Sequence, residues 1–335
     1  MDFDKILQET LEIQRQANAA WAAGKRELLD DGGLTLTVLG CGTMGIAILG
    51  GIMHALNNPT SSPGDAPTPE KLPTKFRACV RSLESVRRVQ EELGKYNAKL
   101  SLFEGENVKA VQGSNVVLLG CKPYMLADLL REEGMREALA GKILISILTG
   151  VSVEDLHNVL YPKGSEFANK CTIVRAVPNP AAAVRESMTV IAVPNPPLAA
   201  ETDALITWMF TRIGRVLRLP EAHMNVCSTL CGSGPAFVAI MAESLVAGAV
   251  AMGCPREEAR VMAAQTLRGT AALLSVDEDL AVLNRRTSKP NSCTHEGLRV
   301  LEDGAVREKI ALAVREATLA AGRLGSEQER FKHTE

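Results

Sequence analysis

Residues 34–39 (LTLTVL) form a short β-rich run that leads directly into the glycine-rich sequence GCGTMG, and an apolar helical stretch follows as far as Leu56. This order of strand, G-x-G-x-x-G and helix is typical of dinucleotide-binding βαβ units. The first glycine permits a tight turn, the second lets the backbone approach a pyrophosphate, and the third lets helix and strand pack closely. Free N–H groups and the positive dipole at the helix start also favour phosphates. The residues predicted to contact a nucleotide here are Gly40, Gly42, Thr43, Met44 and Gly45.

Strand and helix patterns alternate along the chain after this motif. The predicted strands are Phe76–Val80, Val116–Leu119, Ile143–Ile147, 172–177 and Met188–Val193, and the predicted helices are Leu83–Leu93, 124–139 and 198–212. This alternation is typical of a mostly parallel sheet with helices on both faces. After Pro220 the strand patterns end, and helical patterns fill 221–230, 235–252, 256–274 and 305–322. Because 235–252 is apolar nearly all round and must be enclosed on most sides, we expect a dimer interface between helices.

We therefore predict an α/β Rossmann-type nucleotide-binding domain followed by an all-α dimerisation domain. Residues 1–33 are expected to form an N-terminal helical extension, with an amphipathic pattern over 4–29. The Rossmann-like nucleotide-binding domain is expected over 34–219, the helical dimerisation and substrate domain over 220–325, and a tail over 326–335. Residues 57–75 contain five prolines together with Ser, Thr and Gly, so we expect a surface insertion there.

Composition argues against several classes of partner. Aromatic residues make up 4% of the chain and the formal net charge is −2, so neither stacking platforms nor a positive field favours nucleic acid. The eight cysteines include no C-x-x-C pair, so we expect no metal site and reduced thiols, which are typical of a reducing compartment. The N-terminus lacks the apolar core of a signal peptide, and the most apolar stretch, 234–254, carries Glu243 and Ser244. We therefore expect a cytoplasmic protein in which this stretch is a buried helix and not a membrane span.

The end of the second strand of the nucleotide-binding domain indicates which dinucleotide binds. NAD enzymes usually place an acidic residue there to bind the ribose 2′-hydroxyl. This chain has Val80, Arg81 and Ser82 instead, and a guanidinium matches a 2′-phosphate in charge and in fork geometry. Arg87 and Arg88 on the next helix either assist or lie on a solvated helix face. We therefore expect NADPH to be preferred, with NADH as a weaker alternative.

Five sequence blocks, in order, resemble those of the pyrroline-5-carboxylate reductases, which make proline by reducing a cyclic imine. They are GCGTMGIAI, NVVLLGCKP, ILISILTGVSVEDL, VRAVPNPAAAVRESMTVIA and LCGSGPAFVAIMAESLVAGAVAMG, and the last resembles the helical-domain signature of the family. The resemblance covers about residues 34–324, and GCGTMGIAI and the 57–75 insertion look like fungal members. It implies further cofactor contacts from Arg81, Ser82, Asn107, Cys121, Lys122, Pro123, Thr149 and Gly150. The alternative for Lys122 is a solvated lysine at a strand end.

The resemblance also implies substrate contacts. Family members place a hydroxyl close to the ring nitrogen shortly before the GSGPA segment, and Ser228 occupies that place as the implied catalytic residue. Their loop of the S-P-G-G-T-T or S-P-G-G-C-T type holds the substrate carboxylate with backbone N–H groups and hydroxyls. The residues implied at the substrate are Asn179, Ser233, Gly234, Ser288, Lys289, Cys293 and Thr294. An alternative for Ser233 is a helix cap.

Two segments at the substrate end depart from the family pattern. In the loop 288–297 (SKPNSCTHEG), Asn291 and Ser292 replace the two glycines, and Lys289 replaces a small hydroxyl residue. Since serine adopts positive φ less readily than glycine, we expect either a rebuilt loop or amides that no longer face the site. Lys289 can still hold a carboxylate as a point charge. In addition, Pro180 follows Asn179 where relatives usually have threonine.

These observations predict an NADPH-dependent reductase of a cyclic imine carboxylate, with 1-pyrroline-5-carboxylate as the first candidate substrate. A protonated imine is already electrophilic, so the task of the protein is to orient the nicotinamide and the imine carbon. A paralogue that reduces a substituted pyrroline or a piperideine carboxylate, and a non-catalytic NADPH-binding protein, stay open. A β-hydroxyacid dehydrogenase is disfavoured because no lysine lies between Lys170 and Lys289. As partners we expect the imine and a second copy of the chain, in a homodimer through the helical domain or in a higher oligomer.

Overall fold

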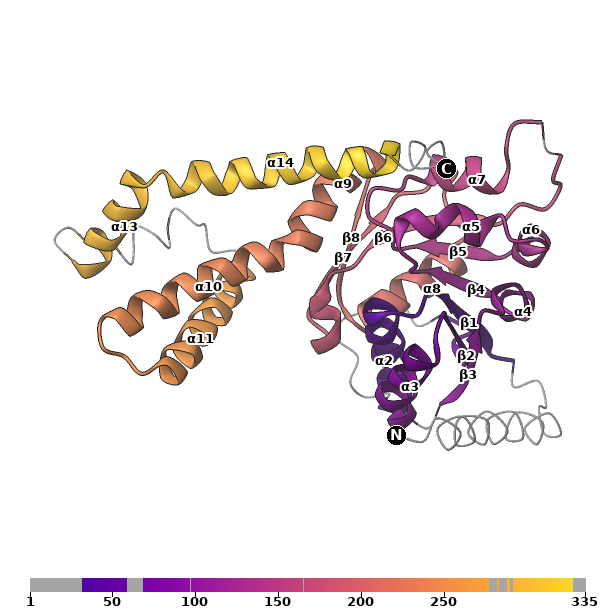
Figure 1. The fold of residues 1–335 in the computed structure, drawn as a ribbon, viewed down its shortest axis with the longest axis horizontal. Coiled ribbons are helices and arrows are strands. Elements are labelled where there is room, and N and C mark those ends of the chain that lie inside the picture. Colours follow the sequence, from indigo (N-terminus) through magenta and orange to yellow (C-terminus); the bar gives the residue numbers. More distant parts are fainter. Residues whose placement is uncertain are drawn as a thin grey trace, which may run out of the picture.

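The computed structural model describes residues 32–58, 69–96, 98–164, 166–276, 282, 288–289 and 292–327. These residues form an α/β body from which a helical arm extends, drawn in orange and yellow in Figure 1. The predicted fold class, a Rossmann-type domain followed by helices, is confirmed. The helix predicted over 4–29, most of the predicted insertion and the end of the predicted tail lie outside the described residues.

The body is built around one eight-stranded sheet with the order β3-β2-β1-β4-β5-β6-β7-β8. Its strands are β1 (Leu34–Leu39), β2 (Pro73–Val80), β3 (Lys99–Glu104), β4 (Val116–Leu119), β5 (Ile143–Ser146), β6 (Thr172–Val177), β7 (Ser187–Ala192) and β8 (Gly214–Leu219). Each neighbouring pair is parallel apart from β6–β7, which is antiparallel. The strands β1 to β6 therefore end at the same edge, and the segments that follow them meet there.

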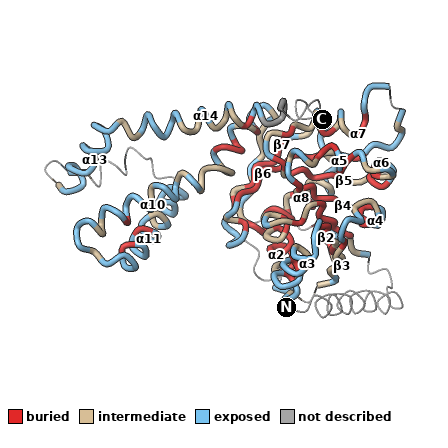
Figure 2. Tube along the Cα trace, viewed as in Figure 1, coloured by how far each residue is buried: buried red, intermediate tan, exposed pale blue. Residues whose placement is uncertain are grey.

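Helices cover both faces of the sheet because the strands alternate apolar side chains between the two faces. In β4, Val116 and Leu118 pack into the core on one face, and Val117 and Leu119 pack into the core on the other. The first core is completed by α2 (Thr43–Asn57), α3 (Leu83–Leu93) and α8 (Ala200–Thr211). The second is completed by α4 (Asn107–Gln112), α5 (Leu126–Leu130), α6 (Met135–Leu139) and α7 (Val153–Leu160). Figure 2 shows the buried residues concentrated in this body.

Some predicted boundaries are wrong. The single helix predicted over 124–139 is divided into the 3-10 helix η2 (Pro123–Met125), α5 and α6, because Gly134 before α6 has a left-handed φ of 83°. The insertion predicted over 57–75 runs too far, since β2 already begins at Pro73, and the first residue of a strand is among the positions that tolerate proline. The elements β3, α4, α7 and β8 were not predicted.

The arm continues from β8 through η4 (Glu221–His223), α9 (Met224–Cys227) and a π-helical segment, η5 (Ser228–Ser233), into α10 (Gly234–Ala251). α11 (Arg256–Leu274) packs against α10. α13 (Cys293–Asp303), which was not predicted, leads into α14 (Val306–Glu327), and α14 returns to pack on α9 and η5 (Figure 1). The last helix of the arm, α14, extends to Glu327.

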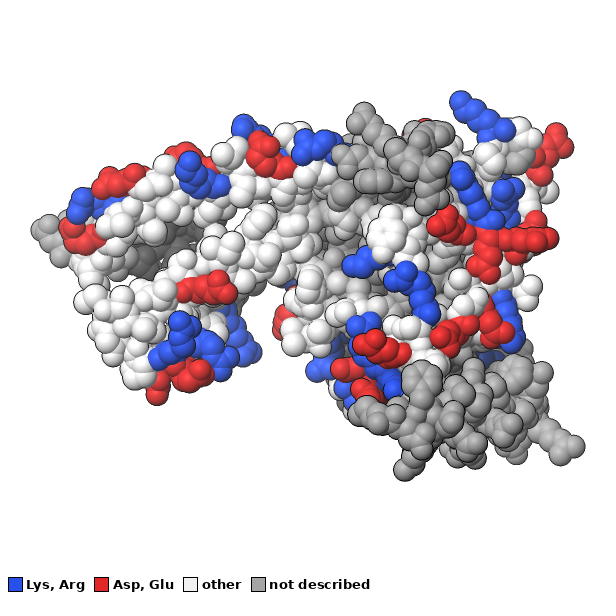
Figure 3. Space-filling view, viewed as in Figure 1, with Lys and Arg blue, Asp and Glu red and all other residues white. Residues whose placement is uncertain are grey.

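α10 carries apolar side chains that a single chain leaves exposed. Val238, Ile240 and Leu245 are 45%, 63% and 52% exposed. Among the described residues, the continuous helix Glu221–Ala251 has 31 residues and is long and apolar enough to cross a membrane by composition, and 6% of its apolar window is buried. Figure 3 shows a largely uncharged surface along α10, with charged side chains on α11 and along α14. The expectation of a buried helix is therefore not met within one chain, and a further apolar surface is needed to cover it.

Candidate active site

The residues predicted to bind a dinucleotide come together at one edge of the sheet. Gly40 lies in the turn after β1, Arg81 follows β2, Asn107 follows β3, Cys121 follows β4 and Thr149 follows β5. These five strands are parallel neighbours. Their carboxyl ends therefore bring the five segments to one edge, which is where ligands bind in open α/β sheets.

The glycine-rich turn has the form of a phosphate cradle. Gly40 has a φ of 77°, and a Cβ there would lie 2.7 Å from Cα and N of Cys121, so only glycine fits. A Cβ on Gly42 would meet nothing within 4 Å, so open space lies in front of this residue. α2 begins at Thr43 with neither a side-chain cap nor an acidic residue in its first turn, so its first N–H groups are available to an anion. These features fit a bound pyrophosphate.

Two arginines lie close to this turn. Burial raises the pKa of the Cys121 thiol to about 11, and the positive charge of Arg81 opposes that rise. Burial likewise raises the pKa of Cys41 to about 12, and the charge of Arg88 opposes it. Both guanidinium groups are therefore within electrostatic reach of the turn. Both side chains are exposed, so they can form the fork contacts that a 2′-phosphate requires.

Ser82 and Asn107, which the resemblance implies at the cofactor, each have a partner in the protein. Ser82 caps α3, because its Oγ accepts a hydrogen bond from the backbone N of Ser85 at 3.3 Å. Asn107 is the first residue of α4, and its Nδ2 donates to Oε2 of Glu132 at 3.1 Å. That bond orients the amide, and the carbonyl oxygen of Asn107 can accept from a ribose hydroxyl.

The turns after β4 and β5 complete the predicted cofactor edge. Cys121 is buried, whereas Lys122 is exposed at the strand end. Pro123 starts η2, a position at which the missing N–H of proline is not needed. Thr149 is exposed, and Gly150 has a φ of 76° that favours glycine. This edge therefore exposes the hydroxyl group of Thr149 and the ammonium group of Lys122, whereas Cys121 is buried.

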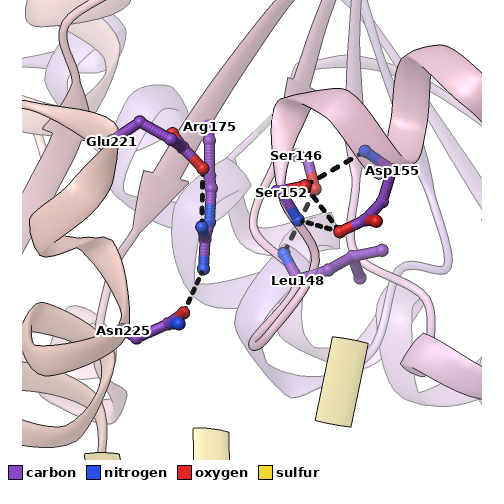
Figure 4. Close-up of polar contacts among 7 residues, drawn as sticks. All are labelled: Ser146, Leu148, Ser152, Asp155, Arg175, Glu221 and Asn225. Carbon is purple, nitrogen blue, oxygen red and sulfur yellow. Dashed lines mark hydrogen bonds and ion pairs between the residues drawn. The ribbon is translucent and has the colours of Figure 1, made fainter. Parts of the chain in front are cut away.

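Hydrogen bonds hold the loop after β5 in place (Figure 4). The backbone N of Leu148 donates to Oγ of Ser146 at 3.4 Å, and Ser146 is fully buried at the end of β5. Ser152 and Asp155 form a capping box at the start of α7, with the Ser152 N–H donating to Oδ2 of Asp155 at 2.8 Å. The loop between these two anchors carries Gly150, so its conformation is fixed from both sides.

Asn179 lies at the end of β6 and is 8% exposed. Its Oδ1 accepts from the backbone N of Ala181 at 3.1 Å and caps the 3-10 helix η3 (Pro180–Val184). Its own N–H donates to Oγ of Ser187 at 3.0 Å. Pro180 is the first residue of η3, where proline is favoured because its fixed φ suits a helix start. The replacement of the usual threonine by Pro180 therefore agrees with the local structure.

Ser228 is the first residue of the π-helical segment η5 and is 4% exposed. The preceding residue, Cys227, packs with Met224 and Val177 in a small apolar cluster. Val177 is the last residue of β6, which runs parallel to β5. The cluster therefore holds Ser228 beside the edge at which the cofactor segments meet. π-Helical turns are frequent at functional sites.

Ser233 and Gly234 mark the change from the π-helical segment to α10. Ser233 has a helical conformation, with φ of −90° and ψ of −23°, and makes no side-chain cap. The alternative of a capping serine is therefore wrong, because the helix continues through this point from α9 to α10. The predicted substrate role of Ser233 stays a prediction.

The predicted substrate loop lies elsewhere in the chain. Cys293 and Thr294 begin α13 and are exposed, as is Lys289, while Ser288 is half-buried. Figure 1 shows α13 at the end of the arm that is remote from the sheet. A single chain therefore does not bring these four residues to Ser228.

Ser292 caps α13. Its Oγ accepts from the backbone N of His295 at 3.2 Å, and its φ of −90° is ordinary for serine. Ser292 therefore does not meet the difficulty with positive φ that was expected where relatives have glycine. Asn291, the other replaced glycine, lies outside the described residues.

Arg175 is a charged residue near the site that sequence reasoning missed. It is 3% exposed in β6, its Nη1 lies 2.7 Å from Oε1 of Glu221, and its Nη2 donates to Oδ1 of Asn225 at 3.3 Å (Figure 4). The sequence does contain a signal for this bridge, namely an arginine inside the apolar strand sequence TIVRAV. An arginine in such a strand is expected to be buried, and a buried charge needs a partner.

Within the part of the chain that the structure describes, neither metal-ligand groups nor a cavity at the opposite edge of the sheet indicates a second site. Among the described residues, no group of three or more His, Cys, Asp or Glu is placed to bind a metal ion. A cavity of about 330 Å³, lined by Leu34, Glu70 and Leu205 among others, lies where β1 begins and so at the opposite edge of the sheet. The carboxyl edge, where the residues predicted to bind a nucleotide meet, is therefore the candidate site.

Two family models match the chain, one on each part. The model described as NADP oxidoreductase coenzyme F420-dependent matches residues 35–150, and the model described as pyrroline-5-carboxylate reductase dimerisation matches residues 221–324. The first lies in the body, and the second covers the arm.

Individual relatives extend over both parts. A pyrroline-5-carboxylate reductase of Lophium arboricola is 51% identical over 300 residues, which cover 87% of this chain and 93% of the relative. One of Neurospora crassa is 46% identical over 309 residues, with 87% and 93% covered. The crystal structure of a Plasmodium falciparum pyrroline carboxylate reductase with NADP bound is similar in fold, with a TM-score of 0.70 at 21% identity, and 87% of this chain and 98% of that chain are covered.

Proposed function

This chain belongs to the pyrroline-5-carboxylate reductase family, and we propose that it reduces 1-pyrroline-5-carboxylate to L-proline with NADPH as the hydride donor. The observation that carries the proposal is the meeting of two kinds of residue at one edge of the sheet. The turns after β1 to β5 offer a site for a phosphorylated dinucleotide, and Ser228 lies beside the end of β6. A buried hydroxyl next to a nicotinamide site suits the orientation of a small imine.

Different residues of this edge would bind different parts of the cofactor. Gly42 and the first N–H groups of α2 would hold the pyrophosphate, and Arg81 and Arg88 would hold the 2′-phosphate. Since Arg81 follows β2, the residues on the β2–β3 side of the turn would hold the adenosine half, and Thr149 and Gly150 after β5 would hold the nicotinamide half. Ser228, beside β6, is then on the nicotinamide side.

The chemistry needs orientation more than acid–base catalysis. When bound, NADPH supplies a hydride to the imine carbon, and the protonated ring nitrogen keeps its proton as the secondary amine of proline. We assign to the hydroxyl of Ser228 a hydrogen bond with this nitrogen. Because Ser228 is almost fully buried, the bond forms away from bulk water and fixes the ring in one orientation.

The residues that suit the substrate carboxylate lie far from Ser228 within a single chain. Lys289, the hydroxyl of Thr294 and the N–H groups at the start of α13 suit a carboxylate, and they lie at the remote end of the arm. We therefore assign them to the site of a second chain, in a homodimer formed through α10. The exposed apolar residues of α10 support this pairing, since they need a cover.

The cellular setting follows from the same features. All eight cysteines are free, and five of them are buried. Free thiols in this number fit a reducing compartment, and we assign the enzyme to the cytoplasm. Pairing through α10 would also remove from solvent the helix whose composition resembles a membrane span.

One observation favours a second candidate function. Lys289 adds a positive charge at a position where a small hydroxyl residue is usual in the family, and its side chain is exposed. A changed carboxylate site could select a substituted pyrroline or a six-membered piperideine carboxylate. The hydride chemistry would be the same.

The test is a turnover assay on the purified full-length protein. NADPH oxidation is followed by its absorbance with 1-pyrroline-5-carboxylate, a methyl-substituted pyrroline carboxylate and a piperideine carboxylate, and the products are identified by mass. The proposal expects the plain pyrroline to give the highest kcat/KM and L-proline as product. A preference for either analogue would move the assignment to the second candidate. NADPH binding without turnover of any imine would contradict both and would favour a non-catalytic NADPH-binding protein.

A further inference from the structure

Arg175 joins the sheet to the segment that carries Ser228 (Figure 4). Its Nη1 lies 2.7 Å from Oε1 of Glu221, the first residue of η4, and its Nη2 donates to Oδ1 of Asn225 in α9 at 3.3 Å. Arg175 belongs to the body, whereas Glu221 and Asn225 belong to the start of the arm. The guanidinium therefore bridges the two parts of the chain at their junction.

Stability alone does not account for an arginine at this position. Val174 and Ala176 pack into the larger core on one face of the sheet, so the Arg175 side chain leaves on the other face. There it is 3% exposed, and its Nε and the Oε2 of Glu221 are buried with no hydrogen-bond partner among the described protein atoms. The Glu221 side chain is 37% exposed, and an incompletely satisfied pair of this kind stabilises little, because replacing both partners by apolar residues of similar volume is often neutral or better.

Asn225 connects this bridge to Ser228. It precedes Ser228 by three residues, about one helical turn, and its carbonyl oxygen accepts a hydrogen bond from Oγ1 of Thr229 at 3.3 Å. α9 is only four residues long, and the helix changes to π-helical geometry at Ser228. Because the hydrogen-bond pattern changes from α to π at Ser228, the last α-helical turn sets the direction in which the helix presents Ser228. A contact that fixes this turn therefore fixes the position of Ser228.

We infer that Arg175 is a positioning residue, which holds Ser228 at the carboxyl edge of the sheet through Glu221 and Asn225. The inference rests on the proposed role of Ser228 in orienting the imine. Nη1 and Nη2 of Arg175 are already bound to Glu221 and Asn225, so we assign Arg175 an effect on geometry and no contact with the substrate. The residues assigned to NADPH follow β1 to β5 and are not bonded to this bridge. The turnover rate should therefore depend on Arg175, and NADPH affinity should not.

The first test is Arg175→Met in the full-length protein, which removes the charge and keeps an apolar side chain of comparable length. Asn225→Ala is the second variant, because it leaves the Arg175–Glu221 pair in place. Arg212→Met is the matched control: Arg212 is also buried, at 5% exposed, but it bonds to the backbone oxygen of Trp208 at the end of α8. We expect Arg175→Met to lower kcat roughly 10- to 100-fold, the loss that a displacement of about 1 Å can cause. Asn225→Ala should show a smaller loss, while NADPH Kd stays unchanged in both and Arg212→Met keeps the wild-type kcat.

Double variants with Ser228→Ala distinguish positioning from a general structural effect. If Arg175 acts through Ser228, Arg175→Met should have little further effect on kcat once the hydroxyl is gone. Equal losses of kcat with and without the hydroxyl would overturn the inference. A wild-type kcat for Ser228→Ala would overturn the proposed role of Ser228 and this inference with it. A slow Ser228→Ala beside a full-rate Arg175→Met would overturn the inference alone. If Arg175→Met does not fold, the same comparison with Asn225→Ala decides.

Discussion

Replacement by alanine should affect stability at one glycine of the turn after β1 and ligand binding at another. At Gly40 the chain has a φ of 77°, and the new Cβ would lie 2.7 Å from backbone atoms of Cys121. At Gly42 the φ is −87°, and the new Cβ would meet nothing within 4 Å. Gly40→Ala should therefore damage the fold, and Gly42→Ala should damage only the binding of a ligand that occupies the open space.

The magnitudes follow from the geometry. For Gly40→Ala, the left-handed φ costs roughly 1–2 kcal/mol, and relief of the contact by separation of β1 from β4 costs about 1–3 kcal/mol more. The expected loss is about 2–5 kcal/mol, or a Tm lower by roughly 4–20 °C, at about 2–4 °C for each kcal/mol. For Gly42→Ala the fold loses only a favourable helix N-cap residue, at a cost of about 1 kcal/mol or less. Its Tm should fall by about 4 °C at most.

The assay pairs thermal unfolding, followed by circular dichroism, with NADPH affinity, followed by the fluorescence of the reduced nicotinamide. Gly42→Ala should weaken NADPH binding at least about 10-fold, which corresponds to roughly 1.4 kcal/mol. Gly45→Ala is an internal calibration, because its Cβ would lie 2.9 Å from Cγ1 of the buried Val38, which is a side-chain contact, and Gly45 has no left-handed φ. Its Tm should therefore lie between those of the other two variants. Normal NADPH affinity in Gly42→Ala would show that no pyrophosphate approaches this glycine, and a wild-type Tm in Gly40→Ala would refute the argument from strain.

Four further experiments test the cofactor end, the buried thiols (two of the four) and the substrate loop. Arg81→Ala should raise the Kd of NADPH roughly 10- to 100-fold, the loss of a charged hydrogen bond, and leave that of NADH nearly unchanged; equal losses for both would refute the 2′-phosphate contact. Burial raises the pKa of Cys41 and of Cys79 from 9.0 to about 12, so the stability that the neutral thiols contribute should be present below pH 9 and lost as pH rises toward 12, as urea unfolding at a series of pH values would report. In the same folded protein at pH 8, iodoacetamide should modify the exposed Cys293 before either of them, which peptide mapping would show. Lys289→Met should raise KM for the imine roughly 10-fold with an unchanged Kd for NADPH, and an unchanged KM would remove Lys289 from the carboxylate site.

The parts of the fold that were predictable are those in which periodicity and turn residues agree. Leu83–Leu93 and 256–274 carry regular helical patterns, and Val116–Leu119 is a short apolar run between turn residues, so their boundaries agree with the structure. β8 was missed because Arg215 interrupts its apolar pattern at the edge of the sheet, where one side of the strand meets solvent. The break at Gly134 was missed because a glycine inside a helical pattern predicts a weakened helix more often than a left-handed turn.

The cofactor edge was predictable because parallel topology converts sequence order into spatial proximity. Once the strands are placed, the residues that follow them, such as Gly40 and Thr149, must meet at one edge. The bridge from Arg175 to Glu221 was not predictable in the same way, because it joins residues of two domains whose relative placement no local pattern encodes. The π-helical geometry at Ser228 also depends on packing against β6 and β7, and its sequence is compatible with an ordinary helix.

The departures from the family pattern do not by themselves argue for a different reaction. Pro180 is the first residue of η3 and Ser292 caps α13, so each has a local role at a helix start. A substitution that a helix terminus explains is weak evidence for a new substrate. Lys289 differs, because its side chain is exposed and carries a charge that a small hydroxyl residue lacks. Among the described departures, Lys289 is therefore the one that bears on the choice between the plain pyrroline and its larger relatives: if Lys289→Ser changes kcat/KM for all three imines by the same factor, this side chain binds only the carboxylate that they share and does not select among them.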